Sequence, residues 1–117
     1  MGILDRVGGR FGGGGPLRRN PHAADYDHLV RWASAHRGVE AYVEPPTTLN
    51  ELTVVLVDAD GRWTRRAPGG PRAARRLGEQ LAIPVYDVRK VRYPQRMRDH
   101  DARERILRKR AAARELS

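Results

Sequence analysis

Two histidines and one tryptophan at helical spacing are the first residues whose types could do chemistry. His28, Trp32 and His36 follow one another at intervals of four, so a helix would place them on one face. Such a stripe could stack on bases or help to bind a metal ion. Two histidines eight residues apart cannot chelate one ion without a third ligand, and the spacing offers none. We therefore expect the edge of a core here, with Trp32 as a candidate stacking group, and no metal site.

The remaining side chains form no complete catalytic constellation. No Ser-His-Asp or lysine-centred nucleophile arrangement can be assigned, and His22 and His100 fall in segments that we expect to be mobile. The chain contains no cysteine, which excludes disulfides, thiolate zinc sites and cysteine nucleophiles. The sequence therefore predicts a protein that is not an enzyme and has no cofactor.

The chain is strongly basic, with a net charge of +9 in 117 residues, and the charge is unevenly spread. Residues 1–21 hold four basic and one acidic side chain, residues 22–93 hold eleven and nine, and residues 94–117 hold eight and four. A nearly balanced core with cationic ends predicts a folded unit whose tails meet a polyanion. The alternative is that the arginines are merely solvated. The preference for arginine over lysine fits bidentate phosphate contacts, but a GC-rich genome explains it as well.

The candidate phosphate contacts lie in both tails, around the predicted second helix and after the last predicted strand. They are Arg18, Arg19, Arg65, Arg66, Arg72, Arg75, Arg76, Arg89, Lys90, Arg92, Arg96, Arg98, Arg105, Arg108, Lys109 and Arg110. Tyr93 joins Trp32 as a candidate stacking group.

Residues 53–88 predict most clearly the fold that must position these side chains. A β-branched run over 53–58, turn residues over 58–61 and an extended stretch to Arg66 predict a β-hairpin. Pro71 then opens a helix whose apolar side is marked by Ala73, Ala74, Leu77 and Leu81. Residues 83–88 predict a further strand of the apolar kind that lies between two neighbours.

The flanking segments complete the predicted order. Residues 1–21 hold seven of the twelve glycines, which predicts a flexible tail. Asn20 and Pro21 favour a helix over 22–37, buried through Tyr26, Leu29, Val30 and Ala33 and stopped by Gly38, and residues 39–43 alternate as a strand does. Residues 95–115 predict an arginine-rich helix that packs through Met97 or Ile106 and projects its arginines beyond the domain.

The sequence therefore predicts a small α+β domain in the order α-β-β-β-α-β. Residues 1–21 form its tail, residues 22–93 its core and residues 94–117 a basic C-terminal helix. No apolar run approaches the ~20 residues of a membrane span, and no signal-peptide core follows Met1, so we expect a cytoplasmic protein with no membrane partner.

Over residues 24–82 this order resembles the double-stranded-RNA-binding domain. Gly69-Gly70-Pro71, before an Ala-rich and Arg-bearing helix, is similar to the point where that family's second helix meets phosphates. The chain departs from the family by having Ala67-Pro68 and Arg72 in place of a lysine pair, and by the added strand at 83–88. The resemblance is therefore one of topology.

With that last strand, the order also resembles the core of restriction-endonuclease-like nucleases. That family binds magnesium through an Asp on the second strand and a Glu-x-Lys on the third, and Asp58 or Asp60 could supply the first carboxylate. Residues 62–66 contain neither Glu nor Lys, so the metal site is incomplete. The two carboxylates are better explained as turn formers, which leaves a degenerate nuclease as a remote alternative.

Four short segments within residues 25–105 stand out together: Trp63-Thr64-Arg65, Ala73–Arg76, Ile83–Val88 and Tyr93–Arg98. In these segments the chain resembles a family of short, uncharacterised basic proteins of high-GC Gram-positive (actinobacterial) bacteria. Some members carry the label oxidoreductase, which is not carried over because this chain shows no nicotinamide or flavin site.

The charge distribution and the order of the predicted elements together predict a non-enzymatic protein that binds nucleic acid or a ribonucleoprotein through its arginine-rich tails. RNA or the ribosome is expected before DNA. The alternative is a protein-interaction module whose tails fold on an acidic partner in a transcription or translation complex.

Overall fold

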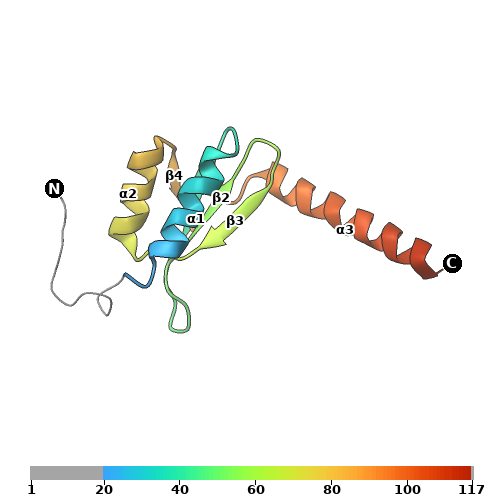
Figure 1. The fold of residues 1–117 in the computed structure, drawn as a ribbon, viewed down its shortest axis with the longest axis horizontal. Helices are drawn as coiled ribbons and strands as arrows, with labels where there is room; N and C mark the ends of the chain where they lie inside the picture. The colour runs from blue at the N-terminus through green and yellow to red at the C-terminus, as the bar shows by residue number, and fades with distance from the viewer. Residues whose placement is uncertain (1–19, 117) are drawn as a thin grey trace.

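The computed structural model describes residues 20–116, so Arg18, Arg19 and most of the predicted tail lie outside the described residues. The α+β class and the order of the elements are confirmed (Figure 1). The elements are α1 (Ala23–Ser34), β1 (Glu40–Glu44), β2 (Thr53–Val57), β3 (Trp63–Arg66), α2 (Pro71–Leu81), β4 (Val85–Asp87) and α3 (Gln95–Leu116).

The four strands form one mixed sheet in the order β3-β2-β1-β4. β2 pairs antiparallel with both β1 and β3, and β1 pairs parallel with β4, so that Tyr42 lies opposite Val55 on one side and Tyr86 on the other. The prediction that residues 83–88 form a strand between two neighbours was wrong, because β4 lies at the edge of the sheet. Its apolar side chains face the layers above and below the sheet, and Val85 remains 41% exposed.

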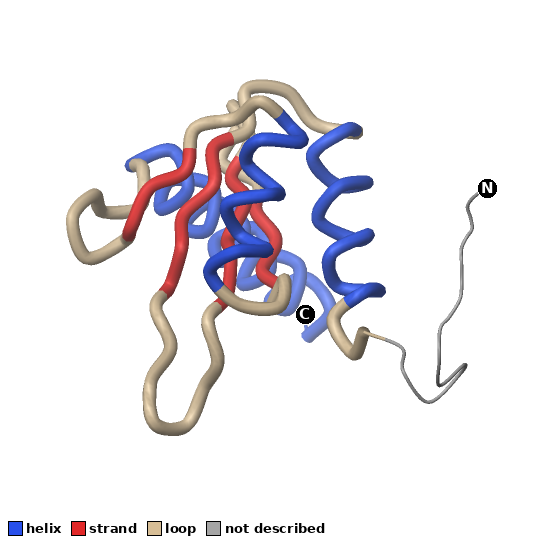
Figure 2. The backbone as a smooth tube through the Cα atoms, turned by 90° about the vertical axis from the view of Figure 1, so that its left-hand side faces the viewer, coloured by secondary structure: helices blue, strands red, loops and turns tan. Residues whose placement is uncertain are grey.

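Helices α1 and α2 lie side by side over one face of the sheet (Figure 2). Leu29 of α1 and Leu77 of α2 are buried there against Val54 and Leu56 of β2. These are the faces that the helical periodicity predicted. Gly78 allows α2 to approach β4 closely, since a Cβ atom there would lie 2.4 Å from a methyl carbon of Val85.

The opposite face of the sheet has its own, smaller core. Val55 and Val57 alternate with the residues of the first core along β2, and they pack with Tyr42 and Met97. β2 is thus buried on both faces, which explains its unbroken run of apolar residues. Met97 is therefore the residue through which α3 packs, whereas Ile106 is 48% exposed.

Two predicted boundaries differ from the structure. Helix α1 ends at Ser34 rather than at residue 37, and Gly38, with φ of 64°, lies in the turn that follows. The Asn20 side chain accepts a hydrogen bond from the His22 amide at 2.8 Å and so forms a turn that leads into the helix. Residues 83 and 84 connect α2 to β4 and are not part of the strand.

The hairpin turn between β2 and β3 depends on one buried carboxylate. Asp58 is 1% exposed, and its Oδ1 accepts hydrogen bonds from the amides of Asp60 and Arg62, both at 2.9 Å. Its Oδ2 accepts one from Arg62 Nε at 3.0 Å. The structure thus gives Asp58 the role of a turn former.

Candidate nucleic-acid interface

The first two turns of α3, residues 95–102, form what we call the anchored segment. Arg96 lies against the sheet, where its Nη2 donates to Glu40 at 2.6 Å and its Nε donates to the carbonyl of Asp58 at 2.8 Å. The hydrogen bond from Arg96, opposed by partial burial, lowers the pKa of Glu40 below its ordinary value. Arg96 therefore holds α3 on the domain.

Two further contacts fix the direction in which α3 leaves the sheet. Trp63 of β3 donates its indole N–H to the Asp101 carboxylate at 2.9 Å. Gly61 lies so close to the helix that a Cβ atom there would stand 2.0 Å from the carbonyl oxygen of Arg96. Because φ of Gly61 is 89°, only glycine fits this position without strain.

Beyond these contacts α3 continues as the projecting segment, residues 103–116, which points away from the domain (Figure 1). Fourteen residues of helix extend for ~21 Å. Almost all of its side chains are exposed, including Ile106 and Leu107. It contains six basic and two acidic side chains.

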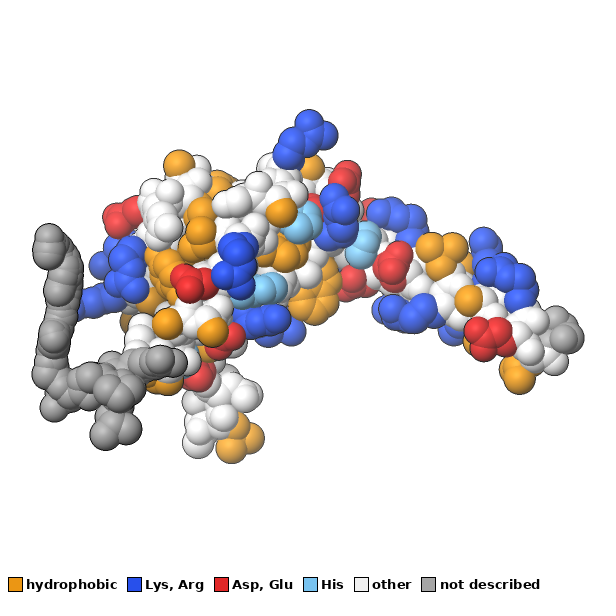
Figure 3. Space-filling model, in the orientation of Figure 1, with side chains coloured by type: hydrophobic (Ala, Val, Ile, Leu, Met, Phe, Trp, Pro, Cys, Tyr) orange, Lys and Arg blue, Asp and Glu red, His pale blue; other side chains and the backbone are white. Residues whose placement is uncertain are grey.

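Most of the cations on the projecting segment have no counterion in the domain. Within residues 20–116, five of them form neither a side-chain hydrogen bond nor an ion pair. These are Arg103, Arg105, Arg108, Lys109 and Arg110. Figure 3 shows basic side chains on both sides of α3 with apolar atoms between them. The projecting segment is therefore an exposed cationic helix that a polyanion can reach.

A second group of cations lies on the outer side of α2. Arg72, Arg75 and Arg76 are exposed there, and the guanidinium of Arg76 lies over the ring of Tyr26 at 5.2 Å from its centroid. The predicted contacts Lys90 and Arg92 are exposed in the connection between β4 and α3. Both groups lie on the surface of the domain, whereas the projecting segment is surrounded by solvent.

Five other predicted contacts are engaged within the domain. Each donates to a carboxylate, a backbone carbonyl or a side-chain amide of a described residue. They are Arg65 to Glu44, Arg66 to the carbonyl of Arg65, Arg89 to Asp87, Arg96 to Glu40, and Arg98 to Tyr93 and Gln95. Arg66 also forms an ion pair with Asp25 at 3.7 Å. Arg65 and Arg89 bind their partners through two nitrogens each, so much of their hydrogen-bonding capacity is used inside the fold.

Glu44, at the end of β1, joins β2, β3 and the segment before α3. It accepts hydrogen bonds from Arg65 Nε at 2.8 Å, from Thr53 Oγ1 at 2.5 Å and from the Tyr93 hydroxyl. Burial alone would raise the pKa of Glu44, but these hydrogen bonds outweigh burial and lower the pKa to about 2. Burial and the Glu44 carboxylate raise the pKa of Tyr93 to about 12.

The two predicted stacking groups are both occupied by intramolecular contacts. Tyr93 is half-buried against Tyr42, with ring centroids 5.6 Å apart. Trp32 is half-buried at the edge of the first core and stacks on His36 at 3.7 Å. His28 shares a hydrogen bond of 2.7 Å with Thr64, so the stripe on α1 forms the edge of the core, as its spacing indicated.

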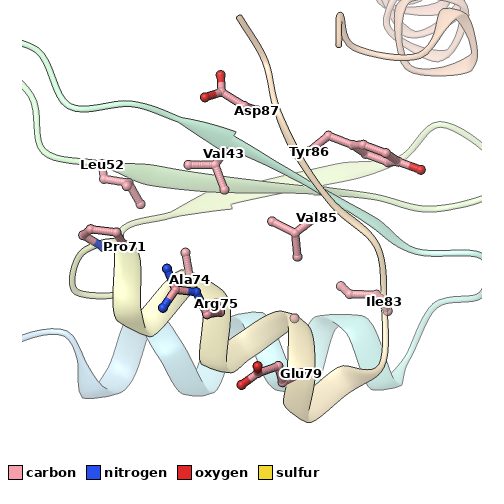
Figure 4. A pocket seen from close by; sticks show the side chains of 11 residues that line it. Val43, Leu52, Pro71, Ala74, Arg75, Glu79, Ile83, Val85, Tyr86 and Asp87 are labelled. Carbon is pink, nitrogen blue, oxygen red and sulfur yellow. The ribbon is translucent and has the colours of Figure 1, made fainter. Parts of the chain in front are cut away.

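A groove between α2 and β4 offers a different kind of surface (Figure 4). It has a volume of about 500 Å³, and its walls include Val43, Leu52 and Val85, with Arg75 and Glu79 on the side of the helix. Its residues include no nucleophile beside a general base. The groove can hold an apolar side chain.

The described residues contain neither a metal-binding cluster nor a membrane-spanning helix. Residues 20–116 contain no group of three or more His, Asp or Glu side chains that could hold a metal ion. In the same part of the chain, no helix has the length and apolar character needed to cross a bilayer.

Sequence reasoning missed three residues that matter here. Arg103 is exposed on the projecting segment seven residues before Arg110, and this helical spacing was a usable signal. Glu40 and Trp63 anchor α3 from the sheet, and nothing in their local sequence indicates it.

Comparisons with protein-family models, with curated proteins and with solved structures find no match to this chain. Its function must therefore be inferred from its own residues and their arrangement.

Proposed function

We propose that this protein is a non-enzymatic nucleic-acid-binding protein that engages phosphates through the projecting segment of α3. The observation that carries the proposal is an isolated helix with six basic side chains, at least five of which lack a counterion among the described residues. Placing such a helix in solvent rather than on the domain leaves its cations available for a partner. A cytoplasmic location, and kinship with the basic actinobacterial family, belong to the same proposal.

The charge of the segment explains why a polyanion suits it. Arg105 and Lys109 stand four residues apart, where like charges destabilise a helix by a few tenths of a kcal/mol. Phosphates relieve this repulsion, and their condensed counterions are released when the cations bind. Affinity should therefore fall steeply as the salt concentration rises.

The test is fluorescence anisotropy of the full chain with RNA and DNA oligonucleotides of equal length at several salt concentrations. A triple variant, Arg105→Gln, Lys109→Gln and Arg110→Gln, should reduce the slope of log affinity against log salt by about 2 to 3. Glutamine keeps the helix because its helix propensity is close to that of lysine and arginine.

A charge-matched control separates location from net charge. Arg72→Gln, Arg75→Gln and Arg76→Gln remove the same three charges from α2 and should change the slope by less than about 1. Equal losses from the two triple variants would overturn the assignment to α3. Absence of binding by the unmodified chain at low salt would overturn the function itself.

A protein-interaction module is the second candidate function, and the groove between α2 and β4 favours it. The groove is mainly apolar and lies beside β4, an edge strand that can pair with an added strand. A pull-down that survives nuclease treatment and fails with Val85→Asp would support this candidate. Loss of the same pull-down with the α3 triple variant instead would place the partner on α3.

A further inference from the structure

The side chains of the projecting segment are ordered around its axis. Ala102, Ile106 and Ala113 follow one line along the helix, at intervals of four and seven residues. Lys109 and Arg105 lie on one flank of this line, and Arg110 and Arg103 lie on the other. Within residues 103–116 the line and its two flanks contain no acidic residue. At the domain end the same line begins with Asp99, whose carboxylate accepts a hydrogen bond from the Gln95 side chain at 2.9 Å.

The two acidic residues of the projecting segment lie on the opposite side. Glu104 and Glu115 gather there with Arg108, on the line that continues from Met97 and Asp101. Met97 is buried against the sheet and Asp101 binds Trp63, so this side of α3 faces the domain. The line through Ile106 consequently faces away from the domain.

An apolar line with a row of cations on each flank matches a groove that has a phosphate backbone on each side. A helix that lies along a groove meets phosphates on both flanks, and small or apolar side chains face the floor. The major groove of B-form DNA is about 12 Å wide, and an α-helix with its side chains is about 10–12 Å across. The domain stands behind the helix and leaves this face open.

We propose that the projecting segment of α3 lies along the major groove of duplex DNA, with Ile106 toward the base edges. This inference rests on the proposed function and names the class of nucleic acid. It changes the preference for RNA that charge and element order suggested, because the major groove of A-form RNA is too deep and narrow for side chains to read.

Other occupants fit the face less well. A membrane-surface helix needs a broad apolar side, whereas Ile106 is the only large apolar residue on the line itself. A second copy of the segment would bring two sets of cations together, and like-charge juxtaposition across an interface is unfavourable.

The first experiment is a competition with the full chain between duplex DNA, duplex RNA and single-stranded DNA of the same sequence. Duplex DNA should be preferred by roughly tenfold or more. Equal affinity for all three would overturn the groove model while leaving nucleic-acid binding intact. Failure to bind any of them would overturn the proposed function as well.

The second experiment locates the helix on the duplex and on its own surface. Dimethyl sulfate methylates guanine N7 in the major groove and adenine N3 in the minor groove, and bound protein should protect N7 only. Ile106→Glu should weaken binding roughly tenfold or more, while Ala111→Glu, the same charge change on the other side of the helix, should weaken it far less. Protection of adenine N3 alone, or equal losses from the two variants, would overturn the groove model.

Discussion

The two segments of α3 belong to one continuous helix and are both rich in arginine, but the structure uses their arginines in opposite ways. In the anchored segment, Arg96 is held between Glu40 and the carbonyl of Asp58. In the projecting segment, Arg110 forms no side-chain hydrogen bond or ion pair with another described residue. An arginine count cannot separate these roles, because the role depends on whether a carboxylate lies within reach. The comparison also divides the expected effects of mutation into losses of stability and losses of binding.

The largest effect should come from breaking the anchored segment at Gly61. Gly61→Ala adds a Cβ atom 2.0 Å from the Arg96 carbonyl at a φ of 89°, so both strain and a backbone clash oppose it. We expect a loss of about 4 kcal/mol in the free energy of unfolding, measured by chemical denaturation. Gly70→Ala is the control, since its φ of 94° adds strain but no atom lies within 4 Å. That variant should lose about 2 kcal/mol, and equal losses would show that the clash does not matter.

The next effect contrasts the two arginines directly. Arg96→Ala removes a charged hydrogen bond and leaves Glu40 without its guanidinium, so it should lower the free energy of unfolding by about 2 kcal/mol. Arg110→Ala should change stability by less than about 0.5 kcal/mol and reduce the salt slope of DNA binding by about 1. Thermal melts and anisotropy on both variants would reveal the division, and a stability loss in Arg110→Ala would contradict it.

A smaller effect concerns the pH range in which the Glu44 cluster supports the fold. The pKa of Glu44 is lowered to about 2, so its contribution is complete above the ordinary value of 4.5 and is lost as the pH falls toward 2. The pKa of Tyr93 is raised to about 12, so its contribution is complete below 10 and is lost as the pH rises through 12. Each loss should amount to about 1 to 2 kcal/mol.

Chemical denaturation at a series of pH values would measure both losses of stability. Glu44→Gln should reduce the loss of stability at acid pH, and Tyr93→Phe should reduce the loss at alkaline pH. An unchanged loss at acid pH in Glu44→Gln would assign the acid sensitivity to other carboxylates.

The smallest effect is expected where β3 meets α3. Trp63→Phe keeps the aromatic packing but removes the hydrogen bond to Asp101, so it should cost about 1 kcal/mol. A double-mutant cycle with Asp101→Asn isolates the pair. A coupling energy near zero would mean that the indole N–H does not help to hold α3.

Local sequence determined the elements because each depends on short-range patterns. Apolar spacing placed α1 and α2, and Asp58 with Gly61 specified the hairpin, since turn geometry and side-chain periodicity involve only nearby residues. Met97 was one of two residues named for packing α3, and burial selects it over Ile106. The sequence also determined that the cations gather at the ends of the chain.

Tertiary structure decided which of those cations remain available. Glu40 lies 56 residues from Arg96, Glu44 lies 21 residues from Arg65, and Asp101 lies 38 residues from Trp63. Such pairs depend on the order of the strands in the sheet. That order could not be predicted locally, because the apolar run that forms β4 fits an internal strand as well as the edge strand that it is. The sequence thus specified how many arginines there are and which helix carries them. The packing of α3 against the sheet determined which side of that helix faces solvent. The physical reason is that a helix can turn only one side toward the core against which it packs.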